Sequence, residues 1–308
     1  MLISPGKFIG FRRIANDDGV LQMLALDQRQ SLFKLLQEQE KDEEKQKTAI
    51  KNIKKNILKT LSEHVSAVLV DGEYAAPELF QYVHPKTGII LSIEKSGYVE
   101  EGQNRLNKLF RSDAVEVAKK WGCDAVKLLI YWNNNVPIKV KEIQEQLVKN
   151  VGEKTKEFDI LFILEIVTYG KLKGKKELIL SGLKNFSSEE YGVDLFKIEP
   201  FTESISTNEI FEATSGKPWV ILSGGADIKN FLPVLEKNQS LGASGFLVGR
   251  VIWKNAVKYF YEDEKMEFYL KTSGIKYLSW IKEKSKYAMP WFMTPFFNGF
   301  EQIRIIKD

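Results

Sequence analysis

The chain has 308 residues, of which 44% are hydrophobic and 28% are charged, so it can bury a sizeable core. Its 45 basic and 41 acidic residues nearly balance, and the basic ones form no stripe interleaved with aromatic residues, which argues against a nucleic-acid partner. A single cysteine, Cys123, excludes an internal disulfide, and we find neither a secretory signal nor an apolar run near the roughly 20 residues that span a bilayer. We therefore expect a cytoplasmic protein without membrane association.

Histidine is scarce in this chain, with only His64 and His84 present. Zinc enzymes draw heavily on His and Cys, so we expect no metal and no other cofactor. The chemistry should then depend on Lys, Asp, Glu, Arg and backbone groups.

Short apolar runs recur along the chain at residues 21–26, 65–70, 88–93, 125–130, 160–166, 193–198, 219–222 and 245–248. The runs are continuous rather than alternating, which is typical of strands buried on both faces. Amphipathic stretches between most of them predict helices at residues 43–63, 112–121, 141–157 and 228–237.

This alternation of strand and helix predicts a parallel sheet of the α/β class. Eight units over about 250 residues predict a closed (β/α)8 TIM barrel. We expect extra helices over residues 255–286 and an irregular aromatic tail at residues 289–300, with residues 1–308 forming a single domain. The segment 97–109 should form an active-site loop.

Active sites of TIM barrels lie at the carboxyl ends of the strands, and phosphate sites recur after strands seven and eight. Ser223, Gly224 and Gly225 follow the seventh predicted strand, and Gly249 and Arg250 follow the eighth. Glycine lets backbone N–H groups approach an anion, and the arginine fork suits a phosphate. Alternatively, these are turn glycines beside a surface arginine; two such loops at matching positions favour the phosphate site.

A second set comprises Lys127, Glu165 and Lys197, which would point inward from strands four, five and six. A lysine amine held in a closed core is pushed toward its neutral form, which can attack a carbonyl to give a Schiff base. A carboxylate beside it can move the protons of that reaction. The alternative is a structural ion network, in which Lys197 pairs with Glu199 or another carboxylate.

Several short motifs follow one another along the chain: Asp27-Gln28-Arg29, Val70-Asp71-Gly72-Glu73-Tyr74, Ala125-Val126-Lys127-Leu128, Glu165-Ile166-Val167-Thr168-Tyr169, Phe196-Lys197-Ile198-Glu199, Ser223-Gly224-Gly225 and Val248-Gly249-Arg250. In order and spacing this set resembles the class I tagatose 1,6-bisphosphate aldolases of the DeoC/LacD-type aldolase family. The resemblance implies a metal-independent carbon–carbon lyase. Such an enzyme would reversibly cleave a ketohexose bisphosphate to dihydroxyacetone phosphate and glyceraldehyde 3-phosphate.

The resemblance also implies residue roles. Lys197 would be the Schiff-base lysine and Glu165 the general acid/base, with Lys127 and Asp27 as supporting polar residues. The implied substrate-binding residues are Gln28, Arg29, Ser223, Gly224, Gly225, Gly249 and Arg250. Arg29 is the candidate for the distal phosphate, and the loops after strands seven and eight would hold the ketose 1-phosphate.

Other functions remain open at this point. A sulfofructose-phosphate aldolase of the same group would bind a sulfonate in place of the distal phosphate. A sugar-phosphate isomerase or epimerase could use Glu165 as proton shuttle and Lys197 as electrophile, and a non-catalytic regulator could bind a phosphosugar without turnover. The aromatic tail around Trp291 and Phe297 could cover the barrel floor or a partner in a homo-oligomer.

Overall fold

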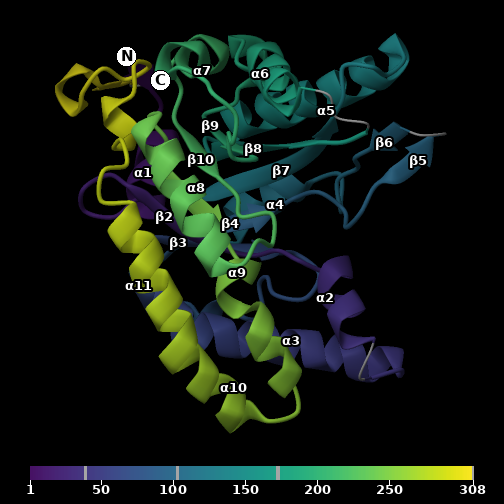
Figure 1. The fold of residues 1–308 in the computed structure, drawn as a ribbon. Coiled ribbons are helices and arrows are strands. Elements are labelled where there is room, and N and C mark those ends of the chain that lie inside the picture. Colours follow the sequence, from purple (N-terminus) through teal and green to yellow (C-terminus); the bar gives the residue numbers. More distant parts are fainter. Residues whose placement is uncertain (38–39, 102–103, 171–173, 307–308) are drawn as a thin grey trace.

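The computed structural model describes residues 1–37, 40–101, 104–170 and 174–306. Eight strands build its centre: β2 (Leu21–Leu26), β3 (Ala67–Asp71), β4 (Gly88–Ser92), β7 (Ala125–Trp132), β8 (Leu161–Thr168), β9 (Leu195–Ile198), β10 (Trp219–Ile221) and β11 (Gly245–Val248). They pair in parallel and close a barrel in the order β10-β11-β2-β3-β4-β7-β8-β9 (Figure 1). Each predicted apolar run overlaps one of these strands, so the predicted TIM barrel is confirmed.

The helices surround this barrel: α1 (Pro5–Ile14), α2 (Gln30–Leu36), α3 (Glu43–Leu61), α4 (Ala114–Lys120), α5 (Ile138–Glu157), α6 (Lys175–Phe186), α7 (Thr207–Thr214), α8 (Ile228–Ser240), α9 (Arg250–Trp253), α10 (Asp263–Tyr269) and α11 (Ile275–Lys284). The predicted helices correspond to α3, α4, α5 and α8, and the predicted C-terminal helices to α10 and α11. Between β3 and β4 the chain makes only the short 3-10 turn Phe80–Tyr82, where two prolines limit regular helix.

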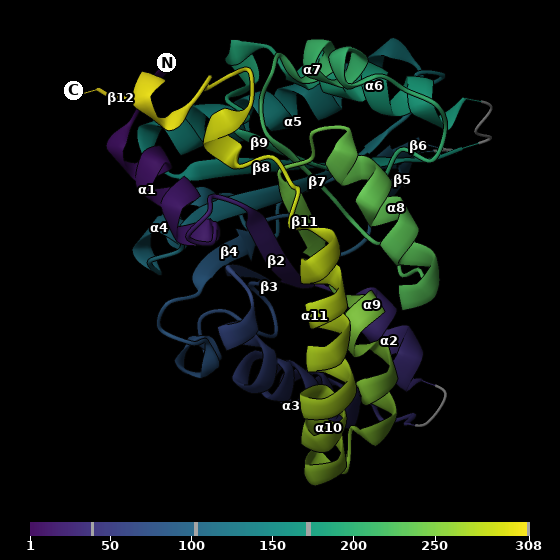
Figure 2. The same cartoon turned by 60° about the vertical axis from the view of Figure 1, so that its left-hand side comes forward.

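The two chain ends meet under the barrel. Strand β1 (Leu2–Ile3) pairs in parallel with β12 (Arg304–Ile305), so the first and last strands lie side by side in the same corner of both views (Figures 1 and 2). Trp291 of the aromatic tail is buried and stacks on Phe11 of α1, with ring centroids 4.6 Å apart. Both rings join the inward-facing strand residues in one core, so the tail covers the barrel floor.

An antiparallel hairpin of β5 (Val99–Glu101) and β6 (Asn104–Leu106) lies at the end of the barrel away from the termini (Figures 1 and 2). The predicted loop 97–109 therefore contains two short strands, and residues 102–103 lie outside the described part. The guanidinium of Arg105 lies 4.6 Å from the ring centroid of Tyr98, 5.3 Å from that of Tyr131 and 5.2 Å from that of Tyr169. These cation–π contacts fasten the hairpin to the ends of β7 and β8.

Among the described residues, we find no helix long and apolar enough to cross a bilayer. That residues 1–308 form a single domain stays a prediction. It is supported by the terminal segments, because α1 and the aromatic tail share the core of the barrel itself.

Candidate active site

Strand register brings three charged side chains together inside the barrel. Alternate residues of β7, β8 and β9 face the interior, beginning with buried apolar residues and continuing to Lys127, Glu165 and Lys197. Glu165 and Lys197 are register partners, and the Lys197 amine donates to Glu165 Oε2 at 2.9 Å. All three side chains are almost completely buried, with 0% of Lys127, 5% of Glu165 and 4% of Lys197 exposed. The cluster expected from sequence is therefore present.

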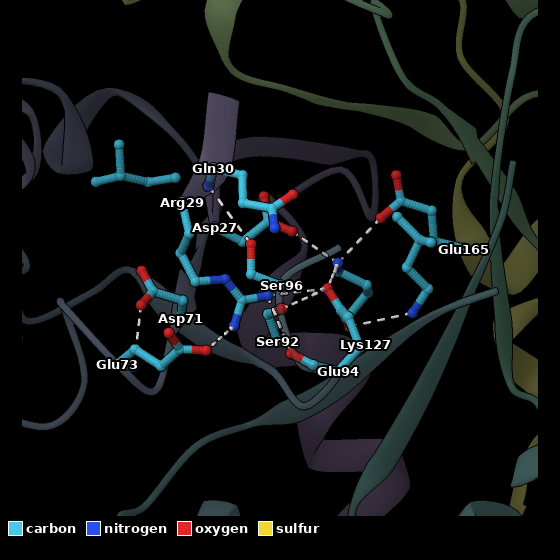
Figure 3. A network of polar contacts seen from close by, with 12 residues as sticks. Asp27, Arg29, Gln30, Asp71, Glu73, Ser92, Glu94, Ser96, Lys127 and Glu165 are labelled. Atoms are coloured by element: carbon cyan, nitrogen blue, oxygen red, sulfur yellow. Dashed lines mark hydrogen bonds and ion pairs between the residues drawn. The ribbon is translucent and has the colours of Figure 1, made fainter. Parts of the chain in front are cut away.

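Lys127 lies among three carboxylates (Figure 3). Its Nζ is 2.6 Å from Asp27 Oδ2, 2.5 Å from Glu94 Oε1 and 3.1 Å from Glu165 Oε2. Burial alone would lower the pKa of Lys127, but these three anions outweigh burial and raise it well above its usual range. Lys127 is therefore held as an ammonium ion.

Asp27 follows β2 and stays ionised in the same network. Burial favours its neutral form, but the attraction of Lys127 and Lys197 outweighs burial and holds the pKa of Asp27 well below its usual range. Two separate carboxylates, Asp27 and Glu165, thus contact the same ammonium group (Figure 3).

Arg29 is engaged with protein groups rather than free in the cavity. Its Nη1 lies 3.0 Å from Glu73 Oε1, and its Nη2 donates to the backbone carbonyl of Glu94 at 3.0 Å (Figure 3). Burial would lower the pKa of Arg29, but the carboxylates around it, Glu94 first, raise it. The guanidinium therefore has less capacity to bind a distal phosphate than the sequence suggests, although it still borders the cavity.

A cavity of about 420 Å³ opens above this network at the carboxyl ends of the strands. Seven predicted site residues line it: Asp27, Gln28, Arg29, Glu165, Lys197, Gly224 and Arg250. Lys127 lies beneath, in contact with Asp27 and Glu165. In the part of the chain that the structure describes, Ser223, Gly225 and Gly249 flank this lining without forming it.

The loops after β10 and β11 need their glycines for backbone reasons. Gly224 and Gly225 have φ of +60° and +85°, a region that favours glycine. A Cβ on Gly225 would lie 3.3 Å from Cζ of Arg250, and one on Gly249 would lie 2.2 Å from the carbonyl oxygen of Ala25. The glycines thus allow Arg250 and the two loops to pack closely at one side of the cavity.

Sequence analysis missed several residues of the site. Glu94 and Tyr131 line the cavity, as do Lys95 and Ser96 of the loop after β4. Burial raises the pKa of Tyr131, so its phenol stays protonated at neutral pH. The signal for Glu94 was its place directly after the third predicted strand, the same position that identified Asp27 after the first.

Of the carboxylates considered as partners of Lys197, the structure selects Glu165 rather than Glu199. Glu199 instead accepts from the backbone N–H and the hydroxyl of Thr168, at 2.8 Å and 2.6 Å, and pairs with Lys175. Among the described residues, we find no group of three or more His, Cys, Asp or Glu side chains arranged to hold a metal ion.

A closed parallel barrel with a polar cavity at the carboxyl ends of its strands is the arrangement of a TIM-barrel enzyme, and the buried lysine beside a carboxylate suits chemistry on a carbonyl compound. The family model for DeoC/LacD family aldolases matches residues 21–255. The chain belongs to this family, and it is therefore an aldolase, a carbon–carbon lyase.

Relatives match over nearly the whole chain. A tagatose 1,6-diphosphate aldolase of Listeria monocytogenes is 28% identical over 340 residues, which cover 99% of this chain and 98% of that protein. Tagatose 1,6-diphosphate aldolase 2 of Streptococcus pyogenes serotype M3 is 30% identical over 307 residues, covering 89% of this chain and 93% of that protein.

Solved structures of aldolases share the fold. The fructose-bisphosphate aldolase of Plasmodium falciparum superposes with a TM-score of 0.68 at 13% identity, covering 92% of this chain and 95% of that one. An archaeal fructose-1,6-bisphosphate aldolase was solved with its catalytic lysine bound to the carbinolamine intermediate. It superposes with a TM-score of 0.61 at 17% identity, and the match covers 92% of this chain and 100% of that one.

Proposed function

We propose that this aldolase works through a Schiff base on Lys197 and reversibly cleaves a ketohexose bisphosphate. The substrate that we propose is tagatose 1,6-bisphosphate. The observation that carries the proposal is the 2.9 Å contact between the Lys197 amine and Glu165 Oε2 inside the barrel mouth. A buried amine next to a carboxylate has both the nucleophile and the proton carrier that imine formation needs. The family and the tagatose 1,6-diphosphate aldolase relatives support the reaction and the substrate class.

The first stage forms the imine. Glu165 takes a proton from Lys197, the resulting amine attacks C2 of the ketose, and the carbonyl oxygen takes up a proton to give a carbinolamine. Glu165 carries protons between the nitrogen and this hydroxyl, which leaves as water. Because Lys127 stays an ammonium ion, it does not compete as nucleophile, and it keeps Glu165 Oε2 in place at 3.1 Å.

The second stage breaks the C3–C4 bond. Glu165, or a water that it positions, takes the proton of the C4 hydroxyl, and the bonding electrons move into the iminium as C3–C4 cleaves. Glyceraldehyde 3-phosphate leaves, and an enamine remains on Lys197. Protonation at C3 followed by hydrolysis of the imine releases dihydroxyacetone phosphate and regenerates the amine.

The barrel order supports a substrate with two anionic ends. Strand β10, which leads to Gly224, lies opposite β4, which leads to Lys95, and both loops line the cavity. Lys197 is on β9, next to β10, so the 1-phosphate would bind near Gly224 and Arg250. The distal phosphate would meet the exposed Lys95 across the mouth, since Arg29 is already paired with carboxylates.

A cleavage assay tests the proposed function. The protein is incubated with tagatose 1,6-bisphosphate, and both triose phosphates are measured as they form. Equal amounts of the two products, lost in Lys197→Ala, are expected. A sugar epimer appearing without triose phosphates would indicate an isomerase, and binding without any product would indicate a regulator. Cleavage of sulfofructose phosphate in preference to the bisphosphate would point to the sulfonate substrate.

A further inference from the structure

The carboxylate of Glu94 has contacts that no assigned role explains. Glu94 follows β4 and is 5% exposed, and each of its two carboxylate oxygens accepts a hydrogen bond. Oε1 lies 2.5 Å from Nζ of Lys127 and accepts from the hydroxyl of Ser92 at 2.6 Å, while Oε2 accepts from the backbone N–H of Leu129 at 3.1 Å. These bonds fix the orientation of the carboxylate (Figure 3).

Arg29 holds Glu94 from the other side. Its Nη2 donates to the carbonyl oxygen of Glu94 at 3.0 Å and lies 3.7 Å from Oε1. Three loops that follow neighbouring strands of the barrel thereby meet: the loop after β2 brings Arg29, the loop after β3 brings Glu73, and the loop after β4 brings Glu94. A carboxylate so firmly held imposes its position on Lys127.

We propose that Glu94 is a positioning residue for the aldolase reaction, which holds the Lys127 ammonium between Asp27 and Glu165. Lys127 is fully buried and acts on the substrate only through those two carboxylates. Without Glu94, the ammonium keeps two anionic partners instead of three, and its place and charge are no longer fixed. This role rests on the proposed function, because it concerns proton transfer by Glu165.

The charges around Lys127 come from several elements. Asp27 after β2, Glu94 after β4 and Glu165 on β8 contact it directly; Lys197 on β9 reaches it through Glu165, and Arg29 through Glu94. Burial would raise the pKa of Glu94, but Lys127 first and then Arg29 lower it, so it is ionised at neutral pH. Loss of this anion should let Lys127 release its proton at lower pH.

The test compares Glu94→Gln with Glu73→Gln. Glutamine keeps the shape of the residue but removes its charge. Both positions contact Arg29, but Glu73 pairs with Arg29 rather than with Lys127. For Glu94→Gln we expect kcat to fall roughly 10- to 100-fold, as for other partners that orient an active-site group, with KM nearly unchanged. The kcat of Glu94→Gln should also begin to fall at a lower alkaline pH than that of the wild type, so the alkaline limb of its pH profile moves down. Glu73→Gln should keep the wild-type limb.

Borohydride trapping with dihydroxyacetone phosphate separates this inference from the proposed function. Absence of a Lys197 adduct in the wild type would contradict the proposed function itself. An adduct in both wild type and Glu94→Gln, with kcat and alkaline limb unchanged in the variant, would overturn only the role of Glu94. If kcat fell but the limb stayed in place, the role would be structural and the inference would also fail.

Should Glu94→Gln fail to fold, Ser92→Ala provides a milder change, because it removes one hydrogen bond to Glu94 Oε1. A several-fold lower kcat with the limb shifted in the same direction would support the inference. A wild-type kcat and pH profile in Ser92→Ala would contradict it.

Discussion

Glu165 and Lys197 are paired in the register of β8 and β9, and the Lys197 amine donates to Glu165 Oε2 at 2.9 Å. Paired strands fix the distance between two backbones, so the contact does not depend on a mobile loop. A proton carrier is thereby placed beside the proposed nucleophile before any substrate binds. The proposed chemistry follows from this arrangement.

Glu165→Gln tests the proton carrier. An amide can still accept a hydrogen bond from Lys197, but it cannot take up a proton. We expect kcat to fall about 10²- to 10⁴-fold, the usual contribution of a general acid/base, while the protein remains folded. Steady-state cleavage kinetics and circular dichroism provide the measurement. A kcat within a factor of three of the wild type would remove Glu165 from the mechanism.

Lys95→Ala tests the distal phosphate position. If Lys95 binds that phosphate, the KM for the ketose bisphosphate should rise about tenfold, the effect of losing one charged hydrogen bond. The KM for the corresponding ketose 1-phosphate should not change, because that substrate lacks the distal group. Lys108→Ala is the matched control, since it is also exposed and its backbone carbonyl bonds the N–H of Lys95. An equal change with both substrates would contradict the assignment.

A buried ion pair between Lys54 and Asp71 lies outside the cavity. Lys54 of α3 donates to Asp71 and, at 2.9 Å, to the carbonyl of Leu26, and both charged side chains are completely buried. Lys54→Ala leaves the Asp71 carboxylate without its cation, and we expect the free energy of unfolding to fall by about 3–5 kcal/mol. Urea denaturation measures this loss.

The control lies one turn away on the same helix. Lys51 pairs with Glu78 at 2.8 Å, but the two side chains are 44% and 67% exposed to solvent. Lys51→Ala should change the free energy of unfolding by less than about 1 kcal/mol. Similar losses in Lys51→Ala and Lys54→Ala would show that burial of the Lys54 pair has no special effect on stability.

Lys217 gives stability a dependence on pH. Burial first, against the attraction of Asp194, lowers the pKa of Lys217 to about 8 from 10.5. Between these values the unfolded chain binds a proton that the folded protein does not, so stability rises with pH. The gain is complete above the unfolded value and absent below about pH 8, and its full size is about 3 kcal/mol.

Urea unfolding at pH 7.5 and pH 9.5 of the wild type and of Lys217→Met isolates this contribution. Other groups also titrate in this interval, so the comparison is between the two proteins. The wild type should gain stability relative to Lys217→Met as the pH rises. A constant difference between them would mean that Lys217 titrates alike in the folded and unfolded states.

The barrel was predictable because both faces of each strand are buried, which leaves continuous apolar runs in the sequence. Lys127, Glu165 and Lys197 were predictable for a related reason: they interrupt such runs with charge. Which carboxylate pairs with Lys197 could not be decided from the sequence, because Glu165 and Glu199 were both possible partners. The register of two distant strands makes that choice.

Glu94 and Arg29 show why the rest of the site was harder to predict. Ile93 extends the third apolar run, so Glu94 reads as the start of a polar loop. Its charged partners are Arg29 and Lys127, and Arg29 pairs in turn with Glu73; barrel closure brings these residues together. The β5–β6 hairpin also depends on distant contacts, because Tyr131 and Tyr169 hold Arg105 in place.

Imine formation at Lys197 is the central claim, and borohydride reduction with dihydroxyacetone phosphate tests it most directly. The intact mass is measured after reduction, and the modified residue is located by peptide mapping. We predict one adduct per chain on Lys197, lost in Lys197→Arg, with Lys127 unmodified because it remains an ammonium ion. No adduct in a preparation that still cleaves the bisphosphate, or an adduct on Lys127 instead, would contradict the account.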